Sequence, residues 1–164
     1  MDQEELMKRR IGHDMGQEEL MKRRMVRALI LFGVTFVALL IFIGLYIDEK
    51  RRVQETYAAQ YKLSLLHASE DIGDYLGGEA DYDMRYVRIT CDMGCANTFA
   101  FLIEDFGDRR KTVNQLYTCL LKYPDQMKTR LTALDAALND MAADLDKGYE
   151  EAAALIESVD KKGT

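Results

Sequence analysis

The chain has 164 residues, 30% of them charged, and a formal net charge of −6. This length leaves room for one domain of modest size once any membrane segment is set aside. Residues 48–164 hold 22 acidic and 15 basic side chains. That acidic balance disfavours nucleic acid as a partner of this part of the chain.

A short tandem repeat opens the sequence. "MDQEELMKRR" at 1–10 returns as "MGQEELMKRR" at 15–24. Each copy places glutamates four residues before cations, a spacing that favours a helix. We predict that 1–27 is a basic cytoplasmic tail that touches lipid headgroups through Lys22, Arg23, Arg24 and Arg27. The repeat is also consistent with a duplication that has no role, or with a start at Met15 instead of Met1.

A single uncharged stretch of twenty residues follows, "ALILFGVTFVALLIFIGLYI" at 28–47. A helix of that length rises about 30 Å, the thickness of the hydrocarbon core of a bilayer. The stretch is too long for the apolar part of a cleaved secretory signal, and no good cleavage site with small residues follows it. We therefore predict an uncleaved signal anchor with one transmembrane helix, in a single-pass membrane protein.

The basic residues around this stretch predict its orientation. Seven lysines and arginines precede it, and four follow within about twenty residues. Because the more basic flank stays in the cytoplasm, we expect a cytoplasmic N-terminus and an extracytoplasmic C-terminal domain at the cell membrane. Anchors of this kind with helical outer domains are typical of bacterial envelopes.

Apolar residues at intervals of three and four predict helices along most of residues 48–160. The first such pattern extends the transmembrane helix to Gly77 and Gly78, with Val53, Tyr57, Tyr61, Leu65, Ala68, Ile72 and Leu76 on one face. The second, at about 81–106, has two apolar faces and is expected to be the most buried helix. Its first face carries Tyr82, Tyr86, Ile89, Met93, Ala96, Ala100 and Ile103, and its second carries Met84, Val87, Cys91, Cys95, Phe99 and Leu102. A strand at "MRYVRIT" is the alternative for part of this segment.

Two further patterns complete the predicted fold. After Gly107, with Asp108 as the expected N-cap, a third helix holds Val113, Leu116, Tyr117, Leu120 and Leu121. Pro124 then opens a last helix with heptad-like spacing, typical of a coiled coil and irregular at 146–148. It carries Met127, Leu131, Leu134, Leu138, Met141, Leu145, Tyr149, Ala152, Ile156 and Val159. The predicted fold class is all-α, an ectodomain bundle of about four helical segments over 48–160, with a frayed tail at 161–164.

Three cysteines lie beyond the apolar stretch: Cys91, Cys95 and Cys119. On an oxidising face of a membrane, an odd number suggests one disulfide and one thiol left over. Cys91 and Cys95 are one helical turn apart, which suits a mutual bond poorly, so the candidate disulfide joins either of them to Cys119. The alternative is that the cysteines are small buried apolar residues. Met93 would point away from Cys91 and Cys95 on a helix, so no metal site is predicted there.

The sequence lacks the patterns that mark common enzyme classes. It has no phosphate-binding glycine loop, no nucleophile elbow and no HExxH. Its two histidines, His13 and His67, lie on opposite sides of the predicted membrane segment. We therefore predict no catalytic residue, cofactor or metal, and expect a non-enzymatic envelope protein whose ectodomain binds another envelope protein or a second copy of itself. The alternatives are a sensor domain that binds a ligand or metal, and a cytoplasmic adaptor of inverted topology.

Overall fold

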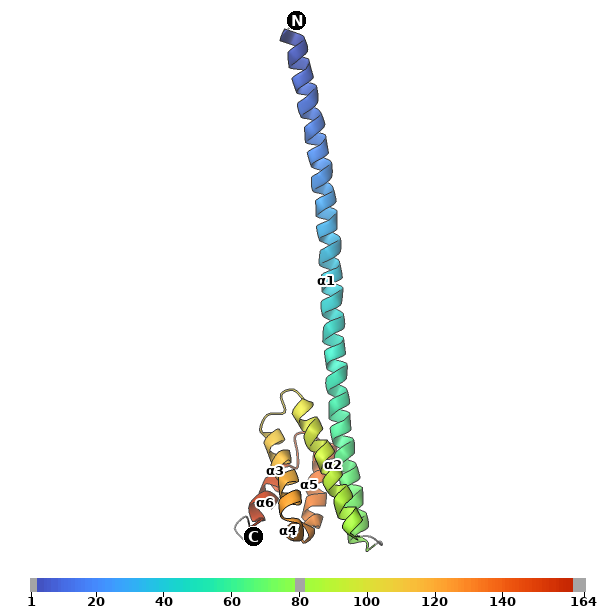
Figure 1. Ribbon diagram of the computed structural model, residues 1–164, viewed down its shortest axis with the longest axis vertical. Coiled ribbons are helices and arrows are strands. Elements are labelled where there is room, and N and C mark those ends of the chain that lie inside the picture. The colour runs from blue at the N-terminus through green and yellow to red at the C-terminus, as the bar shows by residue number, and fades with distance from the viewer. Residues whose placement is uncertain (1–2, 79–81, 161–164) are drawn as a thin grey trace. The chain divides into compact units, whose positions relative to one another are not determined.

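The computed structural model describes residues 3–78 and 82–160, with side chains from Leu20 onward except that of Tyr82. Within these residues the chain forms six helices and no strand (Figure 1). The helices are α1 (Gln3–Leu76), α2 (Tyr82–Leu102), α3 (Asp108–Lys122), α4 (Pro124–Lys128), α5 (Leu131–Ala143) and α6 (Tyr149–Ser158). The predicted all-α class is confirmed. The segment "MRYVRIT" is helical, so the strand alternative is wrong, and the predicted frayed tail at 161–164 lies outside the described residues.

The chain divides into two units, the first ending at Lys50 and the second beginning at Arg51. The described part of the first unit is helical throughout and belongs to α1. Of the described helices, α1 alone is long and apolar enough to cross a membrane, and the apolar window in it is not buried inside the protein. The single candidate membrane-spanning helix near the N-terminus is therefore where the sequence places it.

In the second unit, the last part of α1 and the whole of α2 form an antiparallel pair. The side chain of Gln54 donates to the carbonyl of Leu102, at the end of α2, over 3.3 Å. At the other end, Arg85 near the start of α2 lies 3.1 Å from Asp71 and 2.5 Å from Asp74. The reversal follows Leu76, the last residue of α1, and uses Gly78 at a φ of 75°, a value that favours glycine.

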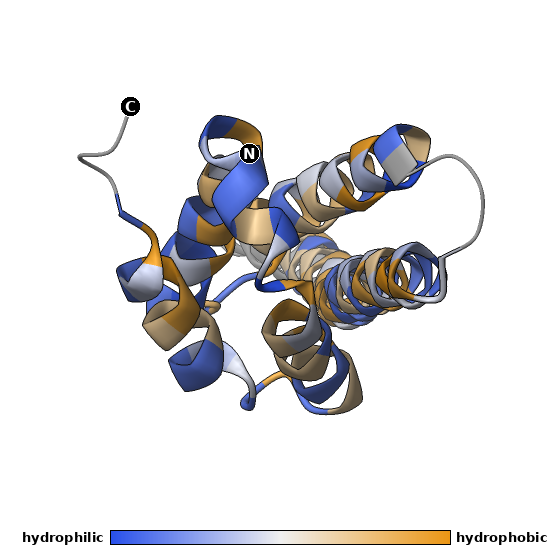
Figure 2. Cartoon of the chain, turned by 90° about the horizontal axis from the view of Figure 1, so that it is seen from below, coloured by the Kyte–Doolittle hydropathy of each residue, from blue (hydrophilic) through white to orange (hydrophobic). Residues whose placement is uncertain are grey.

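A hydrophobic core joins the last part of α1 to α2, α3, α4, α5 and α6. The residues predicted from helical spacing supply it: Tyr61, Leu65, Ala68 and Ile72 from α1, and Ile89, Met93, Ala96 and Ala100 from α2, all fully buried. Val113, Leu116, Met127, Leu134, Leu138, Met141 and Ala152 are buried to the same degree. Figure 2 shows hydrophobic and hydrophilic residues mixed around each of these helices, as expected when each buries one face.

The expected burial of α2 extends to only one of its two apolar faces. Its first face is in the core, but Met84, Val87 and Leu102 on the second face are exposed, as are Cys91 and Cys95. Within the described residues, α1 and α3 pack against α2. One apolar side of α2 therefore stays at the surface.

The second helix also ends earlier than predicted, at Leu102 instead of near Phe106. Residues 103–107 form a loop in which Asp105 and Gly107 both have a φ of 55°. The loop turns the Phe106 ring into the core, where it meets the ring of Tyr61 edge-on at 5.2 Å. Gly107 is the N-cap residue of α3 and Asp108 its first helical residue, which corrects the predicted cap by one position.

The single helix predicted from Pro124 to Val159 is wrong, because three helices, α4, α5 and α6, occupy this segment. Pro124 does open α4, as predicted. The last turn of α5 is followed by a loop at 144–148, and Gly148 precedes α6 with a φ of 80°. The apolar residues of the heptad-like pattern are nevertheless those that enter the core, because short helices that fold back on each other can bury the same stripe.

Candidate functional site

The uncovered apolar side of α2 is the first candidate surface. We call it the α2 face and define it as Met84, Val87, Cys91 and Cys95. Its members recur every three or four residues, so they follow one side of the helix from Met84 to Cys95. Val87 is 54% exposed. A continuous apolar stripe of this kind on a helix typically marks a surface that contacts a partner.

A groove runs beside the α2 face, between α2 and α3, with a volume of about 370 Å³. We call it the α2–α3 groove. Its lining is mostly apolar and consists of Tyr86, Val87, Thr90, Cys91, Tyr117, Leu120, Leu121 and Pro124. The hydroxyl of Tyr86 donates to the Leu120 carbonyl over 2.9 Å, which ties the two helices together across the groove. Burial raises the pKa of the Tyr86 hydroxyl, so it remains a donor at neutral pH.

Gly94 lets α2 and α3 approach closely at one end of this groove. A Cβ atom at Gly94 would lie 3.3 Å from the ring of Tyr117. The ring therefore rests on bare backbone of α2. At the other end of the groove, Pro124 at the start of α4 contributes to the wall. The groove is thus shaped by backbone geometry as well as by side-chain size.

The three cysteines have different environments. Cys91 and Cys95 are exposed thiols on α2, whereas Cys119 on α3 is only 3% exposed. The alternative of a small buried apolar residue therefore fits Cys119 but not the other two. Met93 is fully buried, so it points away from Cys91 and Cys95 as predicted. The predicted disulfide to Cys119 stays a prediction.

The predicted membrane-surface residues all lie on α1 before the apolar stretch. Lys22, Arg23, Arg24 and Arg27 are exposed. The apolar side chains that follow them are exposed as well, with Ala38 alone partly covered among 28–47. This arrangement provides cations next to a continuous apolar cylinder, the pattern expected of a helix that contacts lipid.

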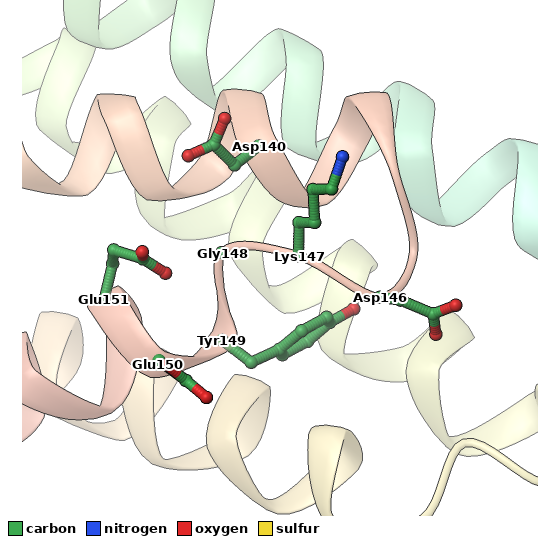
Figure 3. A pocket seen from close by; sticks show the side chains of 7 residues that line it. All are labelled: Asp140, Asp146, Lys147, Gly148, Tyr149, Glu150 and Glu151. Atoms are coloured by element: carbon green, nitrogen blue, oxygen red, sulfur yellow. The ribbon is translucent and has the colours of Figure 1, made fainter.

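A second depression, of about 280 Å³, lies where the loop at 144–148 meets α5 and α6 (Figure 3). Asp140 comes from α5, Glu150 and Glu151 come from the first turn of α6, and Asp146, Lys147, Gly148 and Tyr149 complete the lining. Acidic residues at a helix start stabilise its dipole, which accounts for the glutamates. Among the described residues, no three His, Cys, Asp or Glu side chains are arranged to hold a metal ion.

A buried aromatic cluster lies beneath the loop at 144–148. The hydroxyls of Tyr61 and Tyr149 are 3.1 Å apart, and the Phe106 ring packs edge-on against both tyrosine rings, with centroid distances of 5.2 and 6.0 Å. Burial raises the pKa of both tyrosines, and the Tyr149 hydroxyl raises that of Tyr61 further. Arg109 covers the cluster, donating to the Leu145 carbonyl over 2.9 Å. The cluster is a packing and hydrogen-bonding unit that fixes the loop.

Asp92 is the carboxylate whose environment opposes ionisation. Partial burial raises its pKa, the negative charge of Asp71 raises it further, and His67 and Arg88 lower it in part. His67 is exposed on α1. The group therefore links α1 and α2 electrostatically.

Comparison of the chain with protein-family models, curated proteins and solved structures gives no match.

The α2–α3 groove is the feature that the sequence did not predict. Apart from Pro124, its apolar residues belong to predicted core faces, including Val87 and Leu121. The signal that could have found it is the width of the apolar surface on α2, since a helix with two apolar faces either lies at the centre of a core or presents one face to a partner. Periodicity does not distinguish these two cases.

Proposed function

We propose that this chain is a non-enzymatic, single-pass membrane protein whose extracytoplasmic helical unit binds another protein through the α2 face and the α2–α3 groove. The observation that carries the proposal is the apolar groove beside an uncovered apolar helix face, on a chain that also has a helix long and apolar enough to cross a membrane. The alternatives of a ligand sensor and of a cytoplasmic adaptor stay predictions.

The membrane part of the proposal rests on the uncharged stretch at 28–47 and its flanks. Cations are enriched before the stretch, and they include Lys22, Arg23, Arg24 and Arg27. Because translocation of a cationic flank is disfavoured, the N-terminus stays in the cytoplasm and the second unit lies outside.

The binding part rests on the chemistry of the groove. Its lining offers few hydrogen-bonding groups, so a partner gains binding free energy there mainly by removing apolar surface from water. Apolar side chains presented by an amphipathic helix suit a groove between two helices. A partner anchored in the same membrane is favoured, since anchoring raises the effective concentration of one domain near another. The partner is a second copy of this chain or another envelope protein.

Photo-crosslinking in intact cells tests the binding surface. The photoreactive amino acid p-benzoylphenylalanine replaces Val87 in the groove and, in a control chain, the exposed Thr132 on α5. We expect an adduct at Val87 and none at Thr132. An adduct of about twice the chain mass of 18.8 kDa identifies a second copy, and any other mass identifies a different envelope protein. Equal labelling at both positions, or none at Val87, contradicts the proposal.

Thiol labelling tests the orientation. A maleimide that does not cross membranes should label Cys91 and Cys95 in intact cells, because both side chains are exposed and proposed to lie outside. If labelling requires prior reduction, the same experiment establishes a disulfide. Labelling that appears only after lysis places the second unit inside the cell and supports the inverted topology.

A further inference from the structure

One end of the second unit is tied to the start of its α1 segment by a pair of hydrogen bonds. Gln54 donates to the Leu102 carbonyl over 3.3 Å and accepts from the Glu104 amide over 2.8 Å. The Leu102 carbonyl is one of those that the end of α2 leaves without an intrahelical hydrogen bond, and the Glu104 amide belongs to the loop that follows. The end of α2 and the loop that follows it are therefore held at Gln54.

Gln54 is seven residues beyond Ile47, the last residue of the uncharged stretch. Seven residues span at most about 25 Å even when fully extended, so this limit holds for any arrangement of the two units. If the stretch spans a bilayer, as the proposed function requires, the end of α2 is confined to the neighbourhood of the membrane surface.

This end of the unit exposes two large apolar side chains. Phe101 is 53% exposed and Leu102 is 45% exposed. The guanidinium of Arg110 lies 5.7 Å from the centre of the Phe101 ring and donates to the carbonyls of Ala100 and Ile103 over 3.1 and 2.9 Å. An apolar pair beside an arginine is a combination that suits the membrane interface, where apolar groups enter the lipid and cations meet phosphate.

The two segments next to this contact carry no net charge. Segments 48–60 and 101–111 each contain three acidic and three basic residues. An anionic lipid surface repels acidic protein surface within about 10 Å, and these two segments add no net negative charge to that repulsion. The neighbouring loop contributes Asp146, whose carboxylate pairs with Arg109 over 2.6 Å.

We propose that Phe101 and Leu102 insert into the headgroup region of the phospholipid bilayer, so that the second unit rests on the membrane by this end. Val87 lies fourteen residues away along α2, or about 21 Å at the helical rise. Neither Phe101 nor Leu102 lines the α2–α3 groove, so their insertion leaves the groove lining available to a partner. The inference rests on the membrane anchoring in the proposed function.

Depth-dependent fluorescence quenching tests this contact. A chain with Cys91→Ser, Cys95→Ser and Cys119→Ala receives one new cysteine, labelled with an environment-sensitive nitrobenzoxadiazole dye. The full chain is reconstituted in vesicles of phosphatidylcholine and phosphatidylglycerol, with and without a nitroxide on the fifth carbon of the acyl chain. Leu102→Cys reports the proposed contact. Leu121→Cys, at an equally apolar position of 54% exposure near the end of α3, is the matched control.

We expect the dye at position 102 to emit at shorter wavelength and to lose intensity in nitroxide vesicles, and the dye at position 121 to do neither. Adding Phe101→Ser to the chain labelled at 102 should reduce its quenching. Tyrosine fluorescence and circular dichroism of the unlabelled variants check that the fold is kept.

A third label, at Val37→Cys within the uncharged stretch, separates the two proposals. Quenching at 37 without quenching at 102 leaves the anchor in place and overturns the lipid contact. Absence of quenching at 37 overturns the anchor and the contact together. Equal quenching at 102 and 121 also overturns the inference, because the unit would then lie on the membrane without a preferred end.

Discussion

Replacing Gly148 with alanine tests how the loop at 144–148 positions α6. Gly148 has a φ of 80°, and a Cβ atom there would lie 2.5 Å from the Ala137 carbonyl oxygen and 2.9 Å from the Met141 side chain. The methionine side chain can move, but the carbonyl belongs to the backbone of α5. The loop must therefore shift away from α5, which would disturb the buried residues that follow in α6.

The cost has two parts. A non-glycine residue at positive φ costs about 1–3 kcal/mol. Forcing an extra methyl group into a packed site costs about 1–3 kcal/mol more. We therefore expect Gly148→Ala to lower the free energy of unfolding by about 2–6 kcal/mol. With a urea dependence of about 2 kcal/mol per molar, the transition midpoint should fall by roughly 1–3 M.

The assay is urea unfolding of the full chain in detergent, followed by tyrosine fluorescence, since the sequence has nine tyrosines and no tryptophan. Gly107→Ala is the control, because Gly107 also has a positive φ but a Cβ atom there has no neighbour within 4 Å. Gly107 has a ψ of −136° against −6° at Gly148, so its substitution measures a backbone cost alone, and one at least as large as that at Gly148. If Gly148→Ala lowers the free energy of unfolding by less than about 2 kcal/mol, the close approach of the loop to α5 does not matter and the reasoning is refuted.

Three further substitutions or reagents test other contacts. Arg109→Ala removes the bonds to the Leu145 carbonyl and the Asp146 carboxylate, and should lower the unfolding free energy by about 1–2 kcal/mol in the same assay; an unchanged midpoint would show that these bonds contribute nothing. Asp92→Asn should raise the melting temperature at pH 7 but not near pH 3: a carboxyl whose pKa is raised on folding destabilises the folded state only as the pH rises through that pKa. The opposite pH trend would contradict the cause assigned to the shift. A maleimide should modify Cys91 in the folded protein and Cys119 only on unfolding, which liquid chromatography with mass spectrometry can follow; rapid modification of Cys119 would contradict its burial.

The sequence by itself determined the helical class and much of the core. Leu65 and Ile72 in α1, Met93 in α2 and Leu134 in α5 each belong to a set of apolar residues spaced along one side of their helix. All four are buried. The candidate membrane-spanning helix at 28–47 could also be predicted, because it depends only on the length and apolar composition of one continuous stretch. Periodicity and composition are readable without knowing which segments touch.

The sequence only partly revealed where long helical patterns break. The heptad-like stripe from Met127 to Val159 shows one irregularity, at 146–148, which coincides with the loop before α6, but the break between α4 and α5 leaves no such mark in the sequence. The break before α6 depends on a close contact between Gly148 and the Ala137 carbonyl, and the end of α2 depends on Gln54 and on the Phe106 ring entering the core. Each of these contacts joins residues that are distant along the chain or brought together by a turn.

Only the tertiary structure decided which apolar surface remains uncovered. From spacing alone, the two faces of α2 are equivalent candidates for burial, but α1 and α3 cover the face that carries Met93 and leave Val87 exposed. The same holds for the cysteines, since identical side chains are exposed at position 91 and buried at position 119. Burial depends on the neighbours that a fold supplies, and a sequence pattern records only the capacity to be buried.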